Sequence, residues 1–283
     1  MADDRQDASG TQRTQWDKAA PGWEKHGPEI RDWLRLSTTE MMDKAGVAVG
    51  QTVLDVAAGS GDQSLDLAGR VGPEGQVVAT DISAVMLDFA KANADAAGYR
   101  NVRTHLADAQ DLRLPDASFD AAVCRLGLMF LPDPLAGLTS LFRTLKSGGR
   151  FCSLVFAGPE ANPCLRILMS TAMRHAGLPP GDPFRPGGLV SLGRPGHLDG
   201  LFAQAGFRDV ATTRLDVPIN LPDVTHYLDF IRDAAGPILQ IMSALDAVAR
   251  QVAWDDMAAQ LSVYQSATGW SGPNTLLLTV GTR

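Results

Sequence analysis

The middle of the chain alternates short apolar runs with stretches of helical length. Apolar runs of five to eight residues, separated by helices, are typical of a parallel sheet that is buried on both faces. The pattern extends over residues 51–156. The predicted strands are 52–56, 76–80, 102–106, 119–125 and 149–156, and the predicted helices between them are 62–70, 83–97 and 134–146.

The two flanks of this region follow a different pattern. Residues 13–45 are predicted to be helical, with scattered tryptophan and leucine anchors. After residue 157 helical segments alternate with a loop rich in proline and glycine and with two further strands. The predicted elements there are helices at 162–175 and 196–205, a strand at 207–217, a helical stretch at 222–267 and a final strand at 274–280.

These elements predict the fold class. Strands alternating with helices indicate an α/β protein with a Rossmann-like, doubly wound and mostly parallel sheet of seven strands. The segments outside the alternation are interpreted as helical lid insertions, with helices on the flank of the sheet as the alternative. The predicted division is 1–45 as an N-terminal lid segment, 46–157, 196–221 and 271–283 as the core, and 158–195 and 222–270 as lid insertions.

Composition narrows the class of protein. The chain has 283 residues, a formal charge of −7 and 20% charged residues, which is the balance of a globular protein. A negative net charge argues against a nucleic-acid partner, because phosphate binding needs a dense basic face. We expect no membrane partner, because no run of 18 apolar residues occurs, and the polar N-terminus does not resemble a signal peptide. Three cysteines without metal-ligand spacing predict no metal site and are consistent with a cytoplasmic location.

The strongest local motif is the segment Val53-Leu-Asp-Val-Ala-Ala-Gly-Ser-Gly-Asp62. A buried strand runs into a glycine turn, and a helix is predicted to start at Asp62. Gly59 and Gly61 permit positive φ and leave room for a ligand against the backbone. The free N–H groups of the helix N-terminus suit an anionic group. Asp62 can equally be a helix cap without a ligand role.

Acidic residues occur at the ends of three predicted strands. Asp81 lies 22 residues after Gly59, where a carboxylate can accept from both hydroxyls of a ribose. Asp55 lies inside the strand before the turn, and Asp108 ends the third strand. The third position of the dinucleotide fingerprint is Ser64 rather than glycine or alanine, which argues against NAD. Several acids at strand ends fit S-adenosylmethionine (SAM), which is cationic, better than a pyrophosphate.

These motifs resemble those of class I SAM-dependent methyltransferases, in the broad group that includes the ubiquinone/menaquinone-biosynthesis C-methyltransferases. The resemblance covers residues 15–156, and the rest of the chain matches mainly in layout. Quinone methyltransferases often carry a tyrosine in their N-terminal segment, where this chain has Trp16 and Trp23.

The resemblance implies SAM as cofactor and a set of site residues. Asp55, Gly59 and Gly61, with Ala57 in the same turn, would hold the methionine part of SAM. Asp81 would bind the ribose. The remaining candidates are Ile82 and Met86 beside the nucleoside, Asp108 and Ala109 at the adenine, and Arg125, which follows the fourth strand and either contacts ligand or forms a salt bridge.

Methyl transfer from a sulfonium needs an aligned acceptor and the exclusion of water, so a lid is expected to be functional. Trp16, Trp23, Met129 and Phe130 are candidates for closing over the cofactor, with core packing as the alternative reading. A general base would help some acceptors, and histidine is the usual one. The candidates are His26 as the base and His197 beside the lid, with His226 next; His105 is interpreted as structural.

The predicted function is therefore the SAM-dependent methylation of a small, fairly apolar molecule, with an oxygen, nitrogen or carbon acceptor left open. The alternatives are an NAD(P)-linked oxidoreductase, a SAM-binding protein that catalyses another reaction, and a binding protein without catalysis. The expected partners are a small-molecule substrate and, through an apolar lid face, a second copy in a homodimer.

Overall fold

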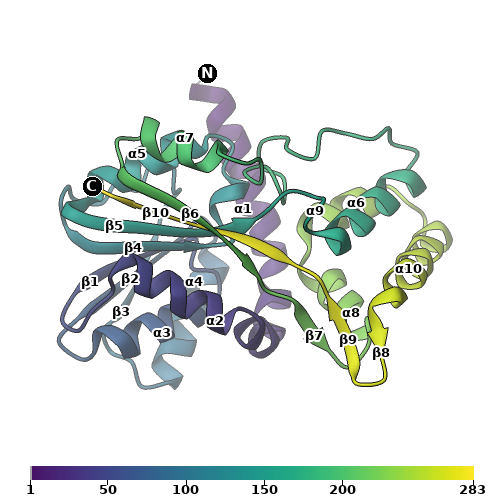
Figure 1. The fold of residues 1–283 in the computed structure, drawn as a ribbon, viewed down its shortest axis with the longest axis horizontal. Helices are drawn as coiled ribbons and strands as arrows, with labels where there is room; N and C mark the ends of the chain where they lie inside the picture. Colours follow the sequence, from purple (N-terminus) through teal and green to yellow (C-terminus); the bar gives the residue numbers. More distant parts are fainter. Residues whose placement is uncertain (1) are drawn as a thin grey trace.

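The computed structural model describes residues 2–283, and side chains from Gly10 onward. A sheet of seven strands forms the centre of the molecule, in the order β3-β2-β1-β4-β5-β10-β6 (Figure 1). The strands β1 to β5 pair in parallel, whereas β10 is antiparallel to both β5 and β6. The predicted fold class is confirmed. The strands are β1 (Thr52–Val56), β2 (Gln76–Asp81), β3 (Val102–Leu106), β4 (Phe119–Arg125), β5 (Leu145–Phe156), β6 (Arg208–Asp216) and β10 (Thr275–Thr282).

Helices cover both faces of this sheet. The helices α2, α3 and α4 contact one another in that order below the sheet in Figure 1, and α5 and α7 pack together above it. Local sequence sets several of their ends: the side chain of Ser83 accepts from Met86 N before α4, and that of Asp133 accepts from Ala136 N before α5. The bounds are α2 (Gly27–Ala45), α3 (Asp62–Val71), α4 (Ala84–Ala96), α5 (Pro134–Thr144) and α7 (His197–Gln204), with a short helix η1 (Leu128–Phe130) after β4.

One boundary inside the core differs from the prediction. The helix predicted over 134–146 ends at Thr144, and β5 begins at Leu145 rather than at residue 149. The strand is irregular there, because Phe119 pairs with Leu145 whereas Ala121 pairs with Arg150. The register shift accommodates Gly148, whose φ of 79° lies in the left-handed region.

A second group of elements lies at one end of the sheet. Its helices bury an apolar cluster of their own, separate from the core around the seven strands. A three-stranded antiparallel sheet in the order β7-β9-β8 belongs to this group and was not predicted. The elements are α6 (Pro163–His175), α8 (Val224–Ala234), α9 (Gly236–Met242), α10 (Ala247–Leu261), η2 (Ser262–Tyr264), β7 (Ile219–Leu221), β8 (Gln265–Ser266) and β9 (Gly269–Gly272).

The long helix α1 (Ala2–Lys25) passes between the two groups in Figure 1 and contacts α4 on one side and α8 and α9 on the other. It gives way to α2 at His26, where Gly27 and Pro28 begin the next helix. The predicted helical segment 13–45 is thus two helices. In the described part of the chain, no helix combines the length and apolar character needed to span a membrane.

Candidate active site

Two adjoining cavities form the candidate site. The first cavity opens where the strand order of the sheet reverses, between β1 and β4. Ligands of doubly wound folds bind at the carboxyl ends of the strands at this point. The walls are the segments that follow β1, β2, β3 and β4, and α1 covers them through Gln12, Trp16 and Trp23. The cavity is open to solvent, and its lining combines apolar side chains with the acidic residues Asp62, Asp81 and Asp108.

The two glycines of the turn after β1 have different structural roles. Gly59 (φ 57°) lines the cavity, and a Cβ placed on it would meet no heavy atom within 4 Å. Gly61 (φ 86°) is not a lining residue; a Cβ there would lie 2.7 Å from the Cβ of Ala90 in α4. Gly59 therefore leaves backbone open to a ligand, whereas Gly61 permits close packing of the turn against α4.

The backbone is strained on both sides of the strand reversal. Ala57 follows β1 with φ of 53°, and Leu126 follows β4 with φ of 58°. Both residues line the first cavity. Non-glycine residues adopt this conformation only at a cost, and such residues cluster at binding and catalytic sites.

Asp81 is held firmly at the end of β2. One carboxylate oxygen accepts from Gly59 N at 3.0 Å and the other from Ser83 N at 2.9 Å. Burial raises the pKa of this carboxyl group, and its backbone hydrogen bonds act in the opposite direction. Each carboxylate oxygen keeps a second lone pair that can accept a further hydrogen bond.

The other predicted nucleoside contacts also line this cavity. They are Ile82, Met86, Asp108 and Ala109, which follow β2 and β3. The Asp108 carboxylate accepts from Gln110 N at 2.9 Å, so the loop after β3 holds it in place. This part of the cavity therefore combines apolar and acidic lining residues.

Asp55 departs from the prediction. It is fully buried behind the cavity wall rather than lining it, and its carboxylate accepts from Gln63 Nε2 and, at 2.5 Å, from Ser64 Oγ. Burial raises its pKa to about 7, against the lowering by Ser64, Arg125 and Gln63. Asp55 thus orients Gln63 and Ser64 from behind.

Gln63 takes the place at the cavity that sequence reasoning assigned to Asp55. Gln63 is a lining residue of the cavity, and its Oε1 is a buried acceptor without a hydrogen-bond partner among the described residues. A buried unpaired acceptor is costly unless a ligand donor reaches it. The only sequence signal was its position, an amide in the first turn of the helix after the glycine motif.

Arg125 forms a buried ion pair at the cavity wall. Its Nη2 donates to both carboxylate oxygens of Asp62 at 2.5 Å, and its Nη1 donates to Thr38 Oγ1 at 2.8 Å. Both partners of the ion pair line the cavity. Of the two readings of Arg125 from sequence, the salt bridge is present, and it lies at the cavity.

A second cavity adjoins the first and is almost entirely apolar. The two share Trp16, Trp23, Leu126 and Phe130 as lining residues. Met129 lines the second cavity only. Its other walls come from α6, α8, α9 and the end of the Pro/Gly-rich loop, so residues far apart in the sequence close it.

Helix α1 is attached on both sides of these cavities. Trp16 packs edge-on against Phe130 with ring centroids 4.9 Å apart, and Gln12 Nε2 donates to Phe130 O. Near its C-terminal end, Trp23 Nε1 donates to Ala234 O of α8 at 3.2 Å. The predicted closing aromatics are therefore brought together over the cavities.

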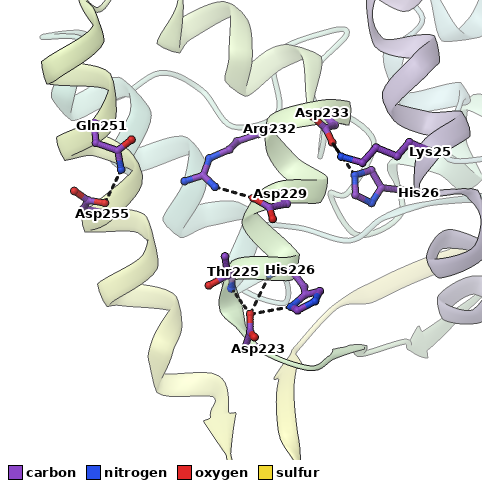
Figure 2. Close-up of polar contacts among 10 residues, drawn as sticks. All are labelled: Lys25, His26, Asp223, Thr225, His226, Asp229, Arg232, Asp233, Gln251 and Asp255. Carbon is purple, nitrogen blue, oxygen red and sulfur yellow. Dashed lines mark hydrogen bonds and ion pairs between the residues drawn. The ribbon is translucent and has the colours of Figure 1, made fainter.

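The structure does not bring the predicted histidines to the cavities. His26 is buried outside both, where its Nε2 lies 2.9 Å from Asp233 Oδ2, and Lys25 Nζ lies 2.7 Å from the same oxygen (Figure 2). This pairing ties the α1–α2 junction to α8. His197 is exposed at the start of α7, and His226 is exposed and bonded to Asp223. A catalytic role for His26 or a lid role for His197 has no geometric support.

Comparison with known proteins assigns the chain to a family. The model of the ubiE/COQ5 methyltransferase family matches residues 31–172, about half of the chain. The chain belongs to this family, which leaves the NAD(P)-linked alternative without support. The ubiquinone/menaquinone biosynthesis C-methyltransferase UbiE of Marinomonas sp. (strain MWYL1) is 38% identical over 130 residues, which cover 45% of this chain and 51% of that protein. The chain thus spans about half the length of the curated relatives it matches.

Solved structures agree on the fold. The YcgJ protein of Bacillus subtilis superposes with a TM-score of 0.59 at 21% identity, covering 88% of this chain and 98% of that one. The [4+2]-cyclase SpnF superposes with a TM-score of 0.55 at 19% identity, covering 94% and 95%. A cyclase on the same fold shows that the fold alone does not decide the reaction.

Proposed function

We propose that this protein uses SAM to methylate a small, largely apolar molecule. The observation that carries the proposal is the junction of two cavities at Trp16, Trp23 and Phe130, one with groups suited to SAM and one nearly without polar groups. Membership of the ubiE/COQ5 methyltransferase family supports it. The matched segment ends before α8, so the substrate side has to be argued from this chain's own residues.

The lining of the first cavity fits SAM at three points. We propose that the Asp81 carboxylate accepts from the ribose hydroxyls and that the segment around Asp108 and Ala109 binds the adenine, since these residues line the cavity. Gln63 Oε1, buried and without a partner, is an acceptor suited to the SAM ammonium group. When bound there, SAM supplies an electrophilic methyl group.

The residues of this chain then align the methyl acceptor with the methyl group and exclude water. Trp16, Trp23 and Phe130 line both cavities, and we propose that they exclude water from the junction when ligands are bound, which favours displacement at a positively charged sulfur. Among the described residues, no histidine lines either cavity. We therefore expect alignment of the acceptor, rather than an imidazole base, to provide most of the rate enhancement.

The acceptor atom belongs to the proposal as well. The printed name of the Marinomonas relative makes a carbon atom of a quinone-biosynthesis intermediate one candidate. Oxygen and nitrogen acceptors remain the others. Incubation with radiolabelled SAM and acceptors of each type tests methyl transfer directly, and it separates this function from a cyclase-like use of the same pocket, in which no labelled product forms.

Calorimetric titration with S-adenosylhomocysteine tests the cofactor assignment. We expect micromolar or tighter binding to the wild type and about a 100-fold loss in Asp81→Ala, since charge-assisted hydrogen bonds contribute about 1.5–3 kcal/mol each. The matched control is Asp88→Ala, which removes an exposed acid from α4. Equal affinities in the two variants would show that Asp81 does not hold the ribose.

The lid, the oligomeric state and the location complete the proposal. We propose that residues 1–45, 158–195 and 222–270 act as lid segments, which is supported by their contributions to the second cavity. We also propose a homodimer through the outer face of α10, where Val248 and Val252 are exposed, and a cytoplasmic location. Light scattering of the purified protein tests the homodimer, and a Val248→Glu variant should then be monomeric.

A further inference from the structure

The second cavity contains few hydrogen-bonding groups, and most of them are already engaged. The indole N–H groups of Trp23 and Trp33 donate to backbone carbonyls of Ala234 and Val217. Trp16 lies at the boundary with the first cavity. Apart from these indoles, the polar side chains among the lining residues are those of Tyr227 and Asn274.

Tyr227 is a buried residue of the second cavity whose hydroxyl group has no hydrogen-bond partner in the described part of the chain. The residue is 3% exposed, its ring stacks on Trp270 with centroids 4.5 Å apart, and its hydroxyl makes no hydrogen bond to any described residue. Phenylalanine would pack equally well at this position, so packing does not explain the hydroxyl. Burial raises the pKa of Tyr227 well above its ordinary value, which keeps the group neutral and able to donate.

Asn274 offers the complementary group. It is 5% exposed, its Nδ2 donates to Gly272 O at 3.1 Å, and its backbone carbonyl accepts from Val217 N at 2.8 Å. These bonds fix the amide, because the flipped rotamer would set its oxygen against the Gly272 carbonyl. Asn274 Oδ1 makes no hydrogen bond within the described part of the chain. The asparagine is thus an oriented acceptor.

We propose that Tyr227 and Asn274 together recognise one neutral hydroxyl group on an otherwise apolar methyl acceptor. A hydroxyl group accepts one hydrogen bond and donates another, which matches one donor and one acceptor in the same cavity. The inference rests on the proposed methyltransferase function, which it extends from the cofactor to the choice of substrate.

Other polar groups match this pair less well. A carbonyl or ether oxygen accepts from Tyr227 but leaves Asn274 Oδ1 unpaired. A carboxylate or ammonium group would lose its hydration in an apolar cavity without an opposite charge, at a cost of several kcal/mol. The pair therefore selects alcohols and phenols over ketones, ethers and ions of the same shape.

Two probes separate the two hydrogen bonds. The hydroxyl of 1-naphthol accepts and donates, whereas the oxygen of 1-methoxynaphthalene only accepts. Both are titrated calorimetrically into wild type, Tyr227→Phe and Asn274→Ala, with S-adenosylhomocysteine present. Tyr264→Phe is the matched control, because Tyr264 also packs against Trp270 but does not line the cavity.

The expected pattern differs between the variants. Tyr227→Phe should weaken both probes about two- to tenfold, the range for one neutral hydrogen bond, and Asn274→Ala should weaken 1-naphthol alone by a similar factor. Tyr227→Phe should also melt at the same temperature as the wild type or higher, which a structural hydroxyl would not do. Tyr264→Phe should change neither affinity.

The inference is overturned if Tyr227→Phe leaves both affinities unchanged, if Asn274→Ala weakens both probes equally, or if the wild type binds neither. Titration of the same samples with S-adenosylhomocysteine reports on the methyltransferase proposal separately. A wild type that does not bind it would refute that proposal, while the naphthol titrations, repeated without it, still decide on the pair.

Discussion

Replacement of Asp55 by asparagine should stabilise the protein, and more strongly at high pH. The carboxyl group is fully buried, and burial raises its pKa from 3.8 to about 7. When the pKa of a carboxyl group is higher in the folded than in the unfolded state, its contribution to the free energy of unfolding is fully present below the unfolded-state pKa. This contribution is lost as the pH rises through the folded-state pKa. The variant has no charge to bury, so the difference between the two proteins should widen from about pH 4 to pH 7.

The magnitude follows from the same pKa. Each pH unit in this window is equivalent to about 1.4 kcal/mol, so the free energy of unfolding of wild type should fall relative to Asp55→Asn by about 4 kcal/mol. The asparagine side chain would also find hydrogen-bond partners. Ser64 Oγ can donate to the asparagine Oδ1, and Gln63 Oε1, which is unpaired in the wild type, can accept from the asparagine Nδ2 once the Gln63 amide has rotated. The rotated Gln63 leaves its Nε2 unpaired in place of its Oε1, so the number of unsatisfied groups does not rise.

Urea unfolding at pH 5, 6, 7 and 8, followed by circular dichroism, measures this difference. Wild type and variant have to be compared at the same pH, because other carboxyl groups make the protein more stable as pH rises. Asp256 is an example, since its pKa is lowered to about 2, mainly by its hydrogen bond with His175. Asp255→Asn is the control, since Asp255 is exposed and accepts only from Gln251 (Figure 2). A pH-independent difference for Asp55→Asn, or a less stable variant at pH 8, would refute the reasoning.

Three further predictions concern the cavity and its cover. Gln63→Met should weaken S-adenosylhomocysteine binding about tenfold but leave 5′-methylthioadenosine, which lacks the ammonium group, unaffected in calorimetry. Gly22→Ala should lower both the melting temperature and the cofactor affinity, because a Cβ would lie 2.1 Å from the carbonyl oxygen of Asp233 and overpacking costs about 1–3 kcal/mol. Arg125→Met should destabilise the protein by about 3 kcal/mol in urea unfolding, because Asp62 is left charged and unpaired.

Each of these variants has a control. Gly10→Ala tests the same substitution in α1 where a Cβ meets no atom within 4 Å; an equal effect at both glycines would contradict the contact with α8. The double variant Arg125→Met with Asp62→Asn should recover most of the lost stability. Equal weakening of both nucleosides by Gln63→Met would count against an ammonium contact.

Much of the core was predictable from sequence because its signals are local. The parallel strands leave short apolar runs that can be recognised without knowing their partners, and the turn at Gly59 has its own backbone requirement. The position of Asp81 at the cavity was predictable for the same reason, since the carboxyl ends of parallel strands meet at one edge of the sheet. The error at Leu145 arose where a strand follows a helix without an intervening turn.

The arrangement of side chains across segments was decided only by the tertiary structure. Asp55 and Gln63 are eight residues apart, and both are polar groups near the glycine motif. Only the folded structure shows that Gln63, to which sequence reasoning assigned no role, lines the cavity and that Asp55 lies behind it. His26 and His197 were placed by proximity along the chain, whereas packing of α1 against α8 and of α7 against α5 turns them away from the cavities.

The sequence by itself determined the sheet, the ligand-binding edge and the class of cofactor, because strand pattern and turn chemistry are properties of neighbouring residues. The tertiary structure alone decided that Trp16, Phe130, Tyr227 and Asn274 surround one apolar cavity. These four come from α1, η1, α8 and the turn before β10. Nothing in a local pattern specifies such a meeting, since it depends on which apolar faces bury one another when the whole chain folds.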